Sequence, residues 1–218
     1  MDDRLRQETV APRTAGAPVC HLVVYVGGKT AAERGDDRIR LEFPRTRPTC
    51  QMPRIRDATL DDAPAIAAIY NESIEARDST MQLARIDAET ARDWIEAMGT
   101  REAVLVMGTG GERIGYGRLK RYSKRGGYRL AAETSIYLRR ARTGEGLGTD
   151  LQAALIERSR AYDYHHLVAK LWADNERSRA LHRKLGYDLV GIQQEIGRVD
   201  GEWQDVAIMQ KLLRSNTA

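Results

Sequence analysis

Hydrophobic residues recur at regular spacings from residue 54 onward, and the period changes along the chain. The short segment Ile55–Ala58, which begins and ends on an apolar residue, is a candidate strand. Beyond it, apolar residues fall on one face of a 3.6-residue period, which predicts a helix from about Asp62. Thr59 or Asp61 can serve as its N-cap, and Pro64 falls in the first turn. The apolar face of this helix consists of Ala63, Ile66, Ala67, Ile69 and Tyr70.

The rest of the domain follows from the same two periodicities. The pair Asp200-Gly201 between the last two apolar runs is a strong hairpin signal. The order βαα, a run of strands and then βαβαββ predicts an α/β (α+β) domain, with a mixed central sheet flanked by helices on both faces. We expect strands at Ala103–Met107, Arg113–Leu119, Thr134–Leu138, His166–Trp172, Leu189–Arg198 and Trp203–Leu212, helices at Asp87–Met98, Thr149–Tyr162 and Glu176–Leu185, and a basic loop at Lys120–Arg129.

Residues 1–51 lack this regularity. They contain four of the six prolines and both cysteines, Cys20 and Cys50, and their only apolar run is Val23–Val26. We interpret 1–51 as an extension without a fixed fold, or as a stretch that precedes the real start at Met52. The folded domain is therefore expected at 52–218.

Composition restricts the partners and the compartment. The chain is 42% hydrophobic and 30% charged, and its net charge of +4 is spread out, so we expect no nucleic acid as partner. No apolar run approaches the roughly 18 residues of a membrane helix, and the first residues lack the order of a signal peptide, so we expect no membrane association. Two cysteines outside any zinc-site spacing indicate a reducing cytoplasm and no metal centre.

The Gly-rich segment Thr143–Gly148 carries the strongest chemical signal. It separates a predicted strand from a predicted helix, and glycine allows a ligand to approach the backbone closely. Free N–H groups and the positive end of the dipole at the helix start favour an anion such as pyrophosphate. Arg139, Arg140 and Arg142 precede the turn and can supply further positive charge. A plain strand-to-helix turn is the competing interpretation.

Two other phosphate-binding motifs do not fit this segment. A P-loop requires a lysine after its last glycine, and none follows Gly148. A dinucleotide-binding GxGxxG motif requires a third glycine where Thr149 or Leu151 stands.

Strand, then (R/Q)xxGx(G/A), then helix is the acetyl-CoA signature of the GNAT acetyltransferases, which this chain resembles from Arg54 to Leu213. It resembles in particular the branch that acetylates phosphinothricin and methionine sulfone or sulfoximine. The matching segments are Glu-Thr-Ser-Ile-Tyr-Leu at 133–138, Asn175 and Ser178 followed by Leu-His-Arg-Lys-Leu-Gly-Tyr at 181–187, and Gly-Glu-Trp-Gln-Asp-Val at 201–206 followed by Met-Gln at 209–210.

The resemblance implies an N-acetyltransferase that moves acetyl from its co-substrate acetyl-CoA directly to the amine of a small, amino-acid-like acceptor. It also implies a homodimer, and no metal or enzyme nucleophile. Glu133 matches the general base that takes a proton from the substrate ammonium, and it belongs to the acceptor site. The other matches are Ile136, Tyr137, Leu138 and Asn175 for the CoA arm, Gly144, Glu145, Gly146, Leu147, Gly148 and Thr149 for the pyrophosphate, and Gly126, Gly127 and Tyr128 for the acceptor.

Two departures bear on affinity and on the acceptor. Thr143 stands where the family has Arg or Gln, and the segment Ser79–Leu83 replaces a Thr-rich stretch that ends in Phe. The basic segment Lys120–Arg125 favours an acceptor with a carboxylate or phosphinate over a polycationic aminoglycoside. The alternatives are a GNAT enzyme for another amine, such as a protein N-terminus or an aminoglycoside, and a non-catalytic acyl-CoA sensor, against which Glu133 argues.

Three aromatic residues and two histidines, which are residue types often found in functional sites, are expected to have structural roles here. Aromatic residues in strands and helices usually pack, and histidines without a metal-ligand pattern are usually structural. We expect the C-terminal hairpin, with Trp203, to be a candidate dimer interface. Packing or structural roles are expected for Tyr137, Trp94, Trp203, His165 and His166.

Overall fold

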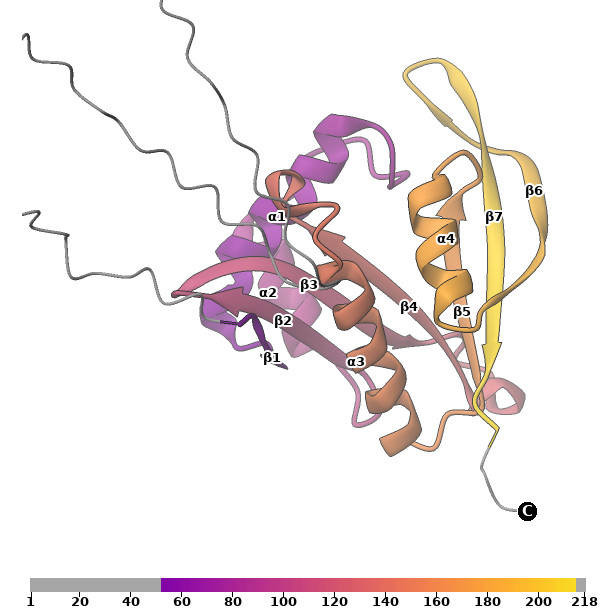
Figure 1. Ribbon diagram of the computed structural model, residues 1–218, viewed down its shortest axis with the longest axis horizontal. Helices are drawn as coiled ribbons and strands as arrows, with labels where there is room; N and C mark the ends of the chain where they lie inside the picture. Colours follow the sequence, from indigo (N-terminus) through magenta and orange to yellow (C-terminus); the bar gives the residue numbers. More distant parts are fainter. Residues whose placement is uncertain (1–51, 215–218) are drawn as a thin grey trace, which may run out of the picture. The chain divides into compact units, whose positions relative to one another are not determined.

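The computed structural model describes residues 52–214, so the extension expected at 1–51 lies outside the described part of the chain. The described part is built on a seven-stranded sheet in the order β1-β2-β3-β4-β5-β7-β6 (Figure 1). The strands are β1 Arg54–Asp57, β2 Ala103–Thr109, β3 Glu112–Arg121, β4 Ala131–Leu138, β5 His166–Trp172, β6 Asp188–Val199 and β7 Glu202–Leu212. The helices are α1 Ala63–Ala76, α2 Ala88–Glu96, α3 Leu147–Ala161 and α4 Glu176–Lys184, with short 3-10 turns η1 Leu60–Asp62, η2 Gly126–Tyr128 and η3 Arg140–Arg142.

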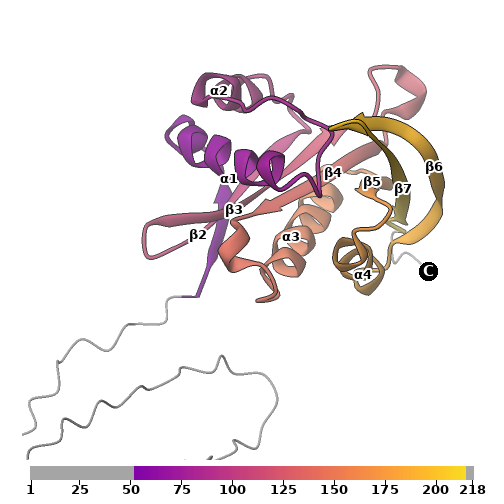
Figure 2. The same cartoon turned by 90° about the horizontal axis from the view of Figure 1, so that it is seen from above.

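Helices cover both faces of the sheet, as the sequence predicted. Helices α1 and α2 lie on one face and α3 and α4 on the other (Figure 2). Alternate residues of a strand point to opposite faces. Strand β2 therefore sends Val104 and Val106 into the core under α1 and α2, and Leu105 and Met107 into the core under α3.

The pairing of β4 with β5 interrupts an otherwise antiparallel sheet. These two strands are parallel, and their register pairs end at Glu133↔Val168. Strand β4 continues to Leu138 and β5 to Trp172 without pairing to each other. The two strands therefore separate beyond Glu133, and Figure 1 shows them diverging.

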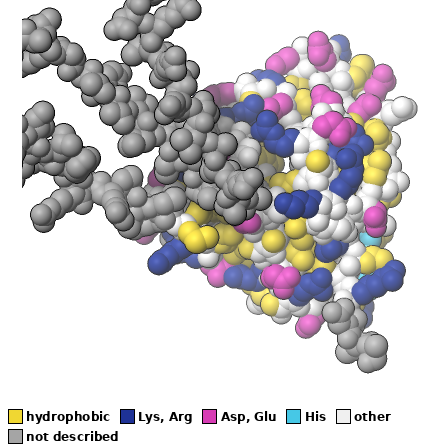
Figure 3. All heavy atoms as spheres, in the orientation of Figure 1, with side chains coloured by type: hydrophobic (Ala, Val, Ile, Leu, Met, Phe, Trp, Pro, Cys, Tyr) yellow, Lys and Arg dark blue, Asp and Glu magenta, His cyan; other side chains and the backbone are white. Residues whose placement is uncertain are grey.

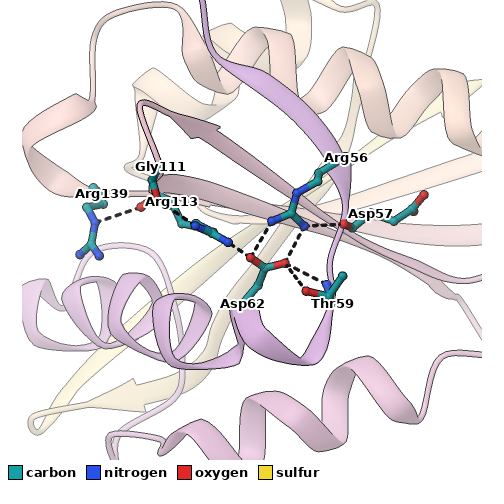
Figure 4. Close-up of polar contacts among 7 residues, drawn as sticks. All are labelled: Arg56, Asp57, Thr59, Asp62, Gly111, Arg113 and Arg139. Atoms are coloured by element: carbon teal, nitrogen blue, oxygen red, sulfur yellow. Dashed lines mark hydrogen bonds and ion pairs between the residues drawn. The ribbon is translucent and has the colours of Figure 1, made fainter. Parts of the chain in front are cut away.

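A buried carboxylate holds the start of α1 against the sheet (Figure 4). The side chain of Asp62 is 0% exposed, and its oxygens accept hydrogen bonds from Arg56 at 2.6 and 2.8 Å and from Arg113 at 2.8 Å. The backbone N–H of Thr59 donates to the same carboxylate at 2.8 Å. Asp62 is also the N-cap of α1, whereas Thr59 caps the preceding turn η1, so neither expected N-cap residue caps the long helix.

The helix after the Gly-rich turn begins earlier than predicted. We expected it from Thr149, but α3 starts at Leu147. The carbonyl of Gly146 accepts a hydrogen bond from the N–H of Thr149 at 2.9 Å, and Leu147 is buried in the core. Burial of Leu147 fixes the first turn of the helix, so only the residues up to Gly146 form the turn. The short turn η3 also separates β4 from this segment, so strand and Gly-rich turn are not directly joined.

Strands β3 and β4 are longer than predicted at the ends where they face each other. Their pairing extends to Arg121↔Ala132, so the basic loop starts only after Arg121. Glu133 therefore lies inside β4 and does not precede it. Backbone hydrogen bonds to a partner strand stabilise these ends even where the side chains are polar.

The charged residues are intermixed on the face drawn in Figure 3. Lys and Arg side chains lie between Asp and Glu side chains there and form no continuous basic area. Within residues 52–214, no helix is long and apolar enough to cross a membrane.

Candidate active site

A cavity of about 520 Å³ opens where β4 and β5 separate. Ser135 and Lys170 line it on the face of α1 and α2, whereas Leu181 and His182 of α4 line it from the other face. The cavity therefore reaches both faces of the sheet. Two ligands can enter such a site from opposite sides and meet between the strands.

The β4 wall of this cavity is formed by residues that the sequence assigned to the cofactor. Ile136, Tyr137 and Leu138 all line it. In this stretch β4 pairs with β3 but not with β5, so its backbone groups on the β5 side have no strand partner within the described chain. An extended ligand with amide groups can hydrogen-bond to such an edge.

Tyr137 also has the packing role that we expected. Its ring stacks on Tyr116 at 5.3 Å between centroids and meets the edge of Tyr70 at 4.8 Å. Burial raises the pKa of the Tyr137 hydroxyl far above its ordinary value. Proton donation by Tyr137 near neutral pH is therefore unfavourable.

The Gly-rich turn has the backbone conformation that only glycine adopts easily. Gly144 and Gly146 have φ values of 91° and 85°. A Cβ built at either position meets nothing within 4 Å, so the space beside the turn is open. Gly148 differs, because a Cβ there would lie 2.9 Å from Leu181 Cδ1, and it serves helix packing. Thr143 and Gly148 line the cavity, whereas Gly144, Glu145, Gly146, Leu147 and Thr149 do not form part of that lining.

The three arginines before the turn each pair with an acidic side chain. Arg139 binds Glu72 at 2.7 Å, Arg140 binds Asp78 at 2.7 Å, and Arg142 binds Glu145 at 2.8 Å. The last pair raises the pKa of Arg142 and lowers that of Glu145. An anionic ligand at this turn competes with these carboxylates, which the sequence did not reveal.

Glu133 forms an ion pair that we did not anticipate. Its Oε2 lies 2.7 Å from Nζ of Lys170 on β5, and the two side chains are 30% and 48% exposed. Lys170 lines the cavity. Glu133 is not part of that lining; it lies next to Lys170, at the last register pair of β4 and β5. The carboxylate is therefore placed at the point where the two strands separate.

The loop that the sequence assigned to the acceptor lies near the Glu133–Lys170 ion pair, and the rings of Tyr128 and Tyr122 lie between them. Gly126, Gly127 and Tyr128 form the turn η2. The ring of Tyr128 lies 5.5 Å from that of Tyr122, and Nζ of Lys170 lies 5.8 Å from the Tyr122 ring centre. The loop thus lies on the Lys170 side of the site, although it is not part of the cavity lining.

Asn175 has a structural role in addition to its place at the cavity. Its Oδ1 caps α4 by accepting from the N–H of Ser178 at 3.0 Å, and its Nδ2 donates to the carbonyl of Asp78 at 3.3 Å. The amide therefore joins α4 to the segment after α1. A CoA contact remains a prediction for Asn175.

The two neighbouring histidines stand at the start of β5. Burial, and the neighbouring His165, lower the pKa of His166. Within residues 52–214, no three His, Cys, Asp or Glu side chains are grouped so that they could hold a metal ion.

Lys170 and Asp78 are among the residues of the site that the sequence analysis missed. Lys170 is the single charged residue between His166 and Trp172, and a lone charge in an apolar strand was the available signal. Asp78 lies after α1 and contacts Arg140, far away in sequence. No local pattern indicates that contact.

Comparison with known proteins agrees with this geometry. Residues 55–208 match the family model described as acetyltransferase (GNAT) domain. The L-methionine sulfoximine/L-methionine sulfone acetyltransferase of Pseudomonas paraeruginosa is 34% identical over 72% of this chain and 92% of its own length. The phosphinothricin N-acetyltransferase of Alcaligenes faecalis is 28% identical over 82% of this chain and 89% of its own length.

Solved structures give the same result. The structure of YncA from Salmonella typhimurium, determined with its cofactor acetyl-CoA, has a TM-score of 0.72 and 30% identity, covering 77% of this chain and 97% of that one. A ribosomal-protein-alanine N-acetyltransferase of Brucella melitensis has a TM-score of 0.71 and 35% identity, covering 73% and 99%. By their names these proteins are all acetyltransferases, and those that name an acceptor name different ones. The chain therefore belongs to the GNAT family of acetyltransferases, as its Gly-rich turn and its strand motif predicted.

Proposed function

We propose that this protein acetylates the amine of a small, amino-acid-like acceptor with acetyl-CoA bound between β4 and β5, and that Glu133 is the general base. The observation that carries the proposal is the separation of β4 from β5 directly after Glu133. It creates the cavity and places a carboxylate at the point where the two strands meet.

The residues present suit acetyl-CoA. The unpaired edge of β4 at Ile136–Leu138 offers hydrogen bonds to an extended arm with amide groups. The turn at Gly144 and Gly146 leaves open space beside the first N–H groups of α3, where a pyrophosphate is favoured. Trp172 Nε1 is a buried donor without a partner within the described chain, and Trp172 lines the same cavity.

The reaction requires a neutral amine. When bound, acetyl-CoA supplies the acetyl group as a thioester. An ammonium group beside Glu133 loses a proton to the carboxylate, directly or through a water molecule, and the free nitrogen can then form the new bond to the acetyl carbon as the bond to sulfur breaks. Lys170 fixes the Glu133 carboxylate at the strand junction. The nitrogen loses a second proton as the amide forms, and of the two protons released one goes to the departing sulfur and the other, by way of Glu133, to solvent.

The acceptor class rests on relatives and on local charge. Relatives act, by their names, on methionine sulfone, methionine sulfoximine and phosphinothricin, all of which are amino acids. Ser79 lines the cavity, and its hydroxyl is buried without a partner within the described chain, so a polar acceptor can satisfy it. The basic segment Lys120–Arg125 favours an acceptor with an anionic group.

Two further parts of the proposal concern assembly and location. A homodimer is supported by the C-terminal hairpin, which carries several exposed, large apolar side chains. Groups of such side chains often mark interaction surfaces. A cytoplasmic location is supported by the scarcity of cysteine, since the chain contains only two. The exposed apolar side chains of β6 and β7 are Leu189 (45%), Val190 (58%), Ile192 (46%), Ile196 (55%), Trp203 (57%) and Leu212 (40%).

The variant Glu133→Gln tests the catalytic role, because it keeps the shape and removes the proton acceptor. With methionine sulfone at pH 7, kcat should fall by about 10²- to 10⁴-fold while the dissociation constant of acetyl-CoA stays nearly unchanged. The loss should shrink at high pH, where more of the amine is already neutral. Glu157→Gln is the matched control, since Glu157 is an exposed carboxylate on α3 that should leave the rate unchanged.

Three results would count against the proposal. A Glu133→Gln enzyme with near-wild-type kcat at pH 7 excludes Glu133 as the base. Acetyl-CoA binding without transfer to any amine favours the sensor alternative. Efficient acetylation of a peptide N-terminus, with none of an amino acid, favours a protein acceptor instead.

A further inference from the structure

A half-buried arginine stands next to the cavity-lining residue Ser135, on the face of the sheet that α1 and α2 cover. Arg118 lies on β3, between Val104 of β2 and Ser135 of β4. Its guanidinium lies 4.2 Å from the ring centre of Trp94 on α2, so it is on the face covered by α1 and α2. No sequence pattern singled it out.

Arg118 has no counterion within the described chain. No ion pair joins it to any residue of 52–214, and its Nε is buried without a hydrogen-bond partner. The acid that acts on it electrostatically, Glu102, already accepts hydrogen bonds from the N–H groups of Gly99 and Arg121. Burial lowers the pKa of Arg118. A half-buried guanidinium whose Nε lacks an acceptor is stabilised by an anion that brings its own acceptor oxygens.

The position of Arg118 relative to the proposed base suits an amino acid. Its cross-strand neighbour Ser135 lines the cavity, and so does Tyr137, the next residue of β4 on that face. Glu133 is its diagonal neighbour across the same two strands, a relation that separates residues by roughly 7–8 Å. An α-amino acid carries its amine and its carboxylate on one carbon, so the two groups can reach two such neighbouring side chains at once.

We propose that Arg118 binds the carboxylate of the acceptor and so selects α-amino acids over amines that lack a carboxylate. The inference rests on the proposed acetyl transfer and adds a specificity residue to it. Trp94 holds the planar guanidinium by stacking, and the free N–H edge forms the paired hydrogen bonds that a carboxylate accepts. Binding of the carboxylate orients the amine toward Glu133.

The experiment compares two acceptors, methionine sulfone and the corresponding amine without its carboxylate, at saturating acetyl-CoA. The wild-type enzyme should prefer the amino acid. In Arg118→Met, KM for methionine sulfone should rise by about 10- to 100-fold, the range for a lost hydrogen bond to a charged group, with kcat changed less. The amine without a carboxylate should be acetylated as before. Arg118→Lys should recover part of the preference, because it restores the charge without the planar fork.

Arg92→Met is the matched control. Arg92 is exposed on α2, two residues from Trp94, so the variant removes an arginine from the same region without touching the sheet. It should keep the wild-type preference. Melting temperatures of all variants show whether the fold is retained.

The outcomes separate this inference from the proposed function. If the wild-type enzyme acetylates both acceptors equally well, or if Arg118→Met lowers both rates alike, the inference is wrong and the acetyl transfer stands. If Arg118→Met does not fold, the wild-type comparison still tests the selection for a carboxylate, and Arg118→Lys, which keeps the charge, tests the residue: an undiminished preference in that variant overturns the inference. If neither acceptor is acetylated, the proposed function fails, and the inference fails with it.

Discussion

Asp62→Asn should destabilise the protein more than its small change in shape implies. The side chain is 0% exposed and accepts hydrogen bonds from Arg56, Arg113 and Thr59, as Figure 4 shows. The variant removes the charge and places an NH₂ group against two guanidinium groups. Breaking a buried ion pair from one side costs about 3–5 kcal/mol.

Exposure of the two arginines to solvent reduces the cost of breaking this ion pair. The side chains of Arg56 and Arg113 are 46% and 34% exposed, so both can be rehydrated once the carboxylate is gone. We therefore expect a loss of about 2–3 kcal/mol in the free energy of unfolding at pH 7. For a domain of this size the melting temperature should fall by about 5–10 °C.

The pH dependence provides an independent check. Burial alone would raise the pKa of Asp62, but the hydrogen bonds from Arg56, Thr59 and Arg113, together with the charge of Arg56, lower it well below its ordinary range. A carboxyl group with a depressed folded-state pKa stabilises the fold above its unfolded pKa of about 4, and this stability is lost as the pH falls toward the folded value. The difference between wild type and Asp62→Asn should therefore be constant from pH 7 to about pH 5 and shrink in more acidic solution.

Urea unfolding between pH 3 and pH 7 measures both effects. Asp61→Asn is the control, because Asp61 is the exposed neighbouring residue and carries the same charge. The reasoning is refuted if Asp62→Asn changes stability by less than about 0.5 kcal/mol, the usual range of a surface substitution, or if the difference persists undiminished below pH 4.

Two other predictions concern the cofactor turn and the N-terminal stretch. Thr143→Arg adds a cation at the cavity wall, where Thr143 Oγ1 donates to the carbonyl of Arg140. The dissociation constant of acetyl-CoA, measured by calorimetry, should therefore stay the same or decrease. Weaker binding would contradict a phosphate site at this turn. A chain that begins at Met52 should keep the activity and the melting temperature of the full chain, because the sequence of 1–51 lacks a periodic apolar pattern that could dock on the domain. A large drop in melting temperature would show that 1–51 contributes to the fold.

Much of the domain could be derived from short-range pattern. Apolar periodicity located the helices and strands of the sheet, because the period of 3.6 or 2 residues depends only on how side chains leave the backbone. Positive φ angles occur at Gly144, at Gly146 and in the turn before β7. Such a conformation is set locally, and a glycine in the sequence indicates it. The match of Glu133–Leu138 to a family motif identified the family, which the family model confirms.

The first and last residues of helices and strands, and the partners of the charged side chains, depend on contacts between segments that are distant in sequence. Helix α3 starts at Leu147 because that side chain is buried in a core built from other strands. The ion pair of Glu133 with Lys170 and that of Arg140 with Asp78 each join residues that are dozens of positions apart. Strand register decides which side chains become neighbours, and register is a property of the assembled sheet.

The chain's own sequence thus determined which elements form, the glycine conformation of the turn and the class of reaction, because these depend on local conformation and on short motifs. Only the tertiary structure decided that β4 and β5 separate after Glu133, that each arginine before the turn already has an acidic partner, and that Arg118 has none within residues 52–214. Electrostatic partners are selected by distance in space. That distance is set only when the strands have paired and the helices have packed on them.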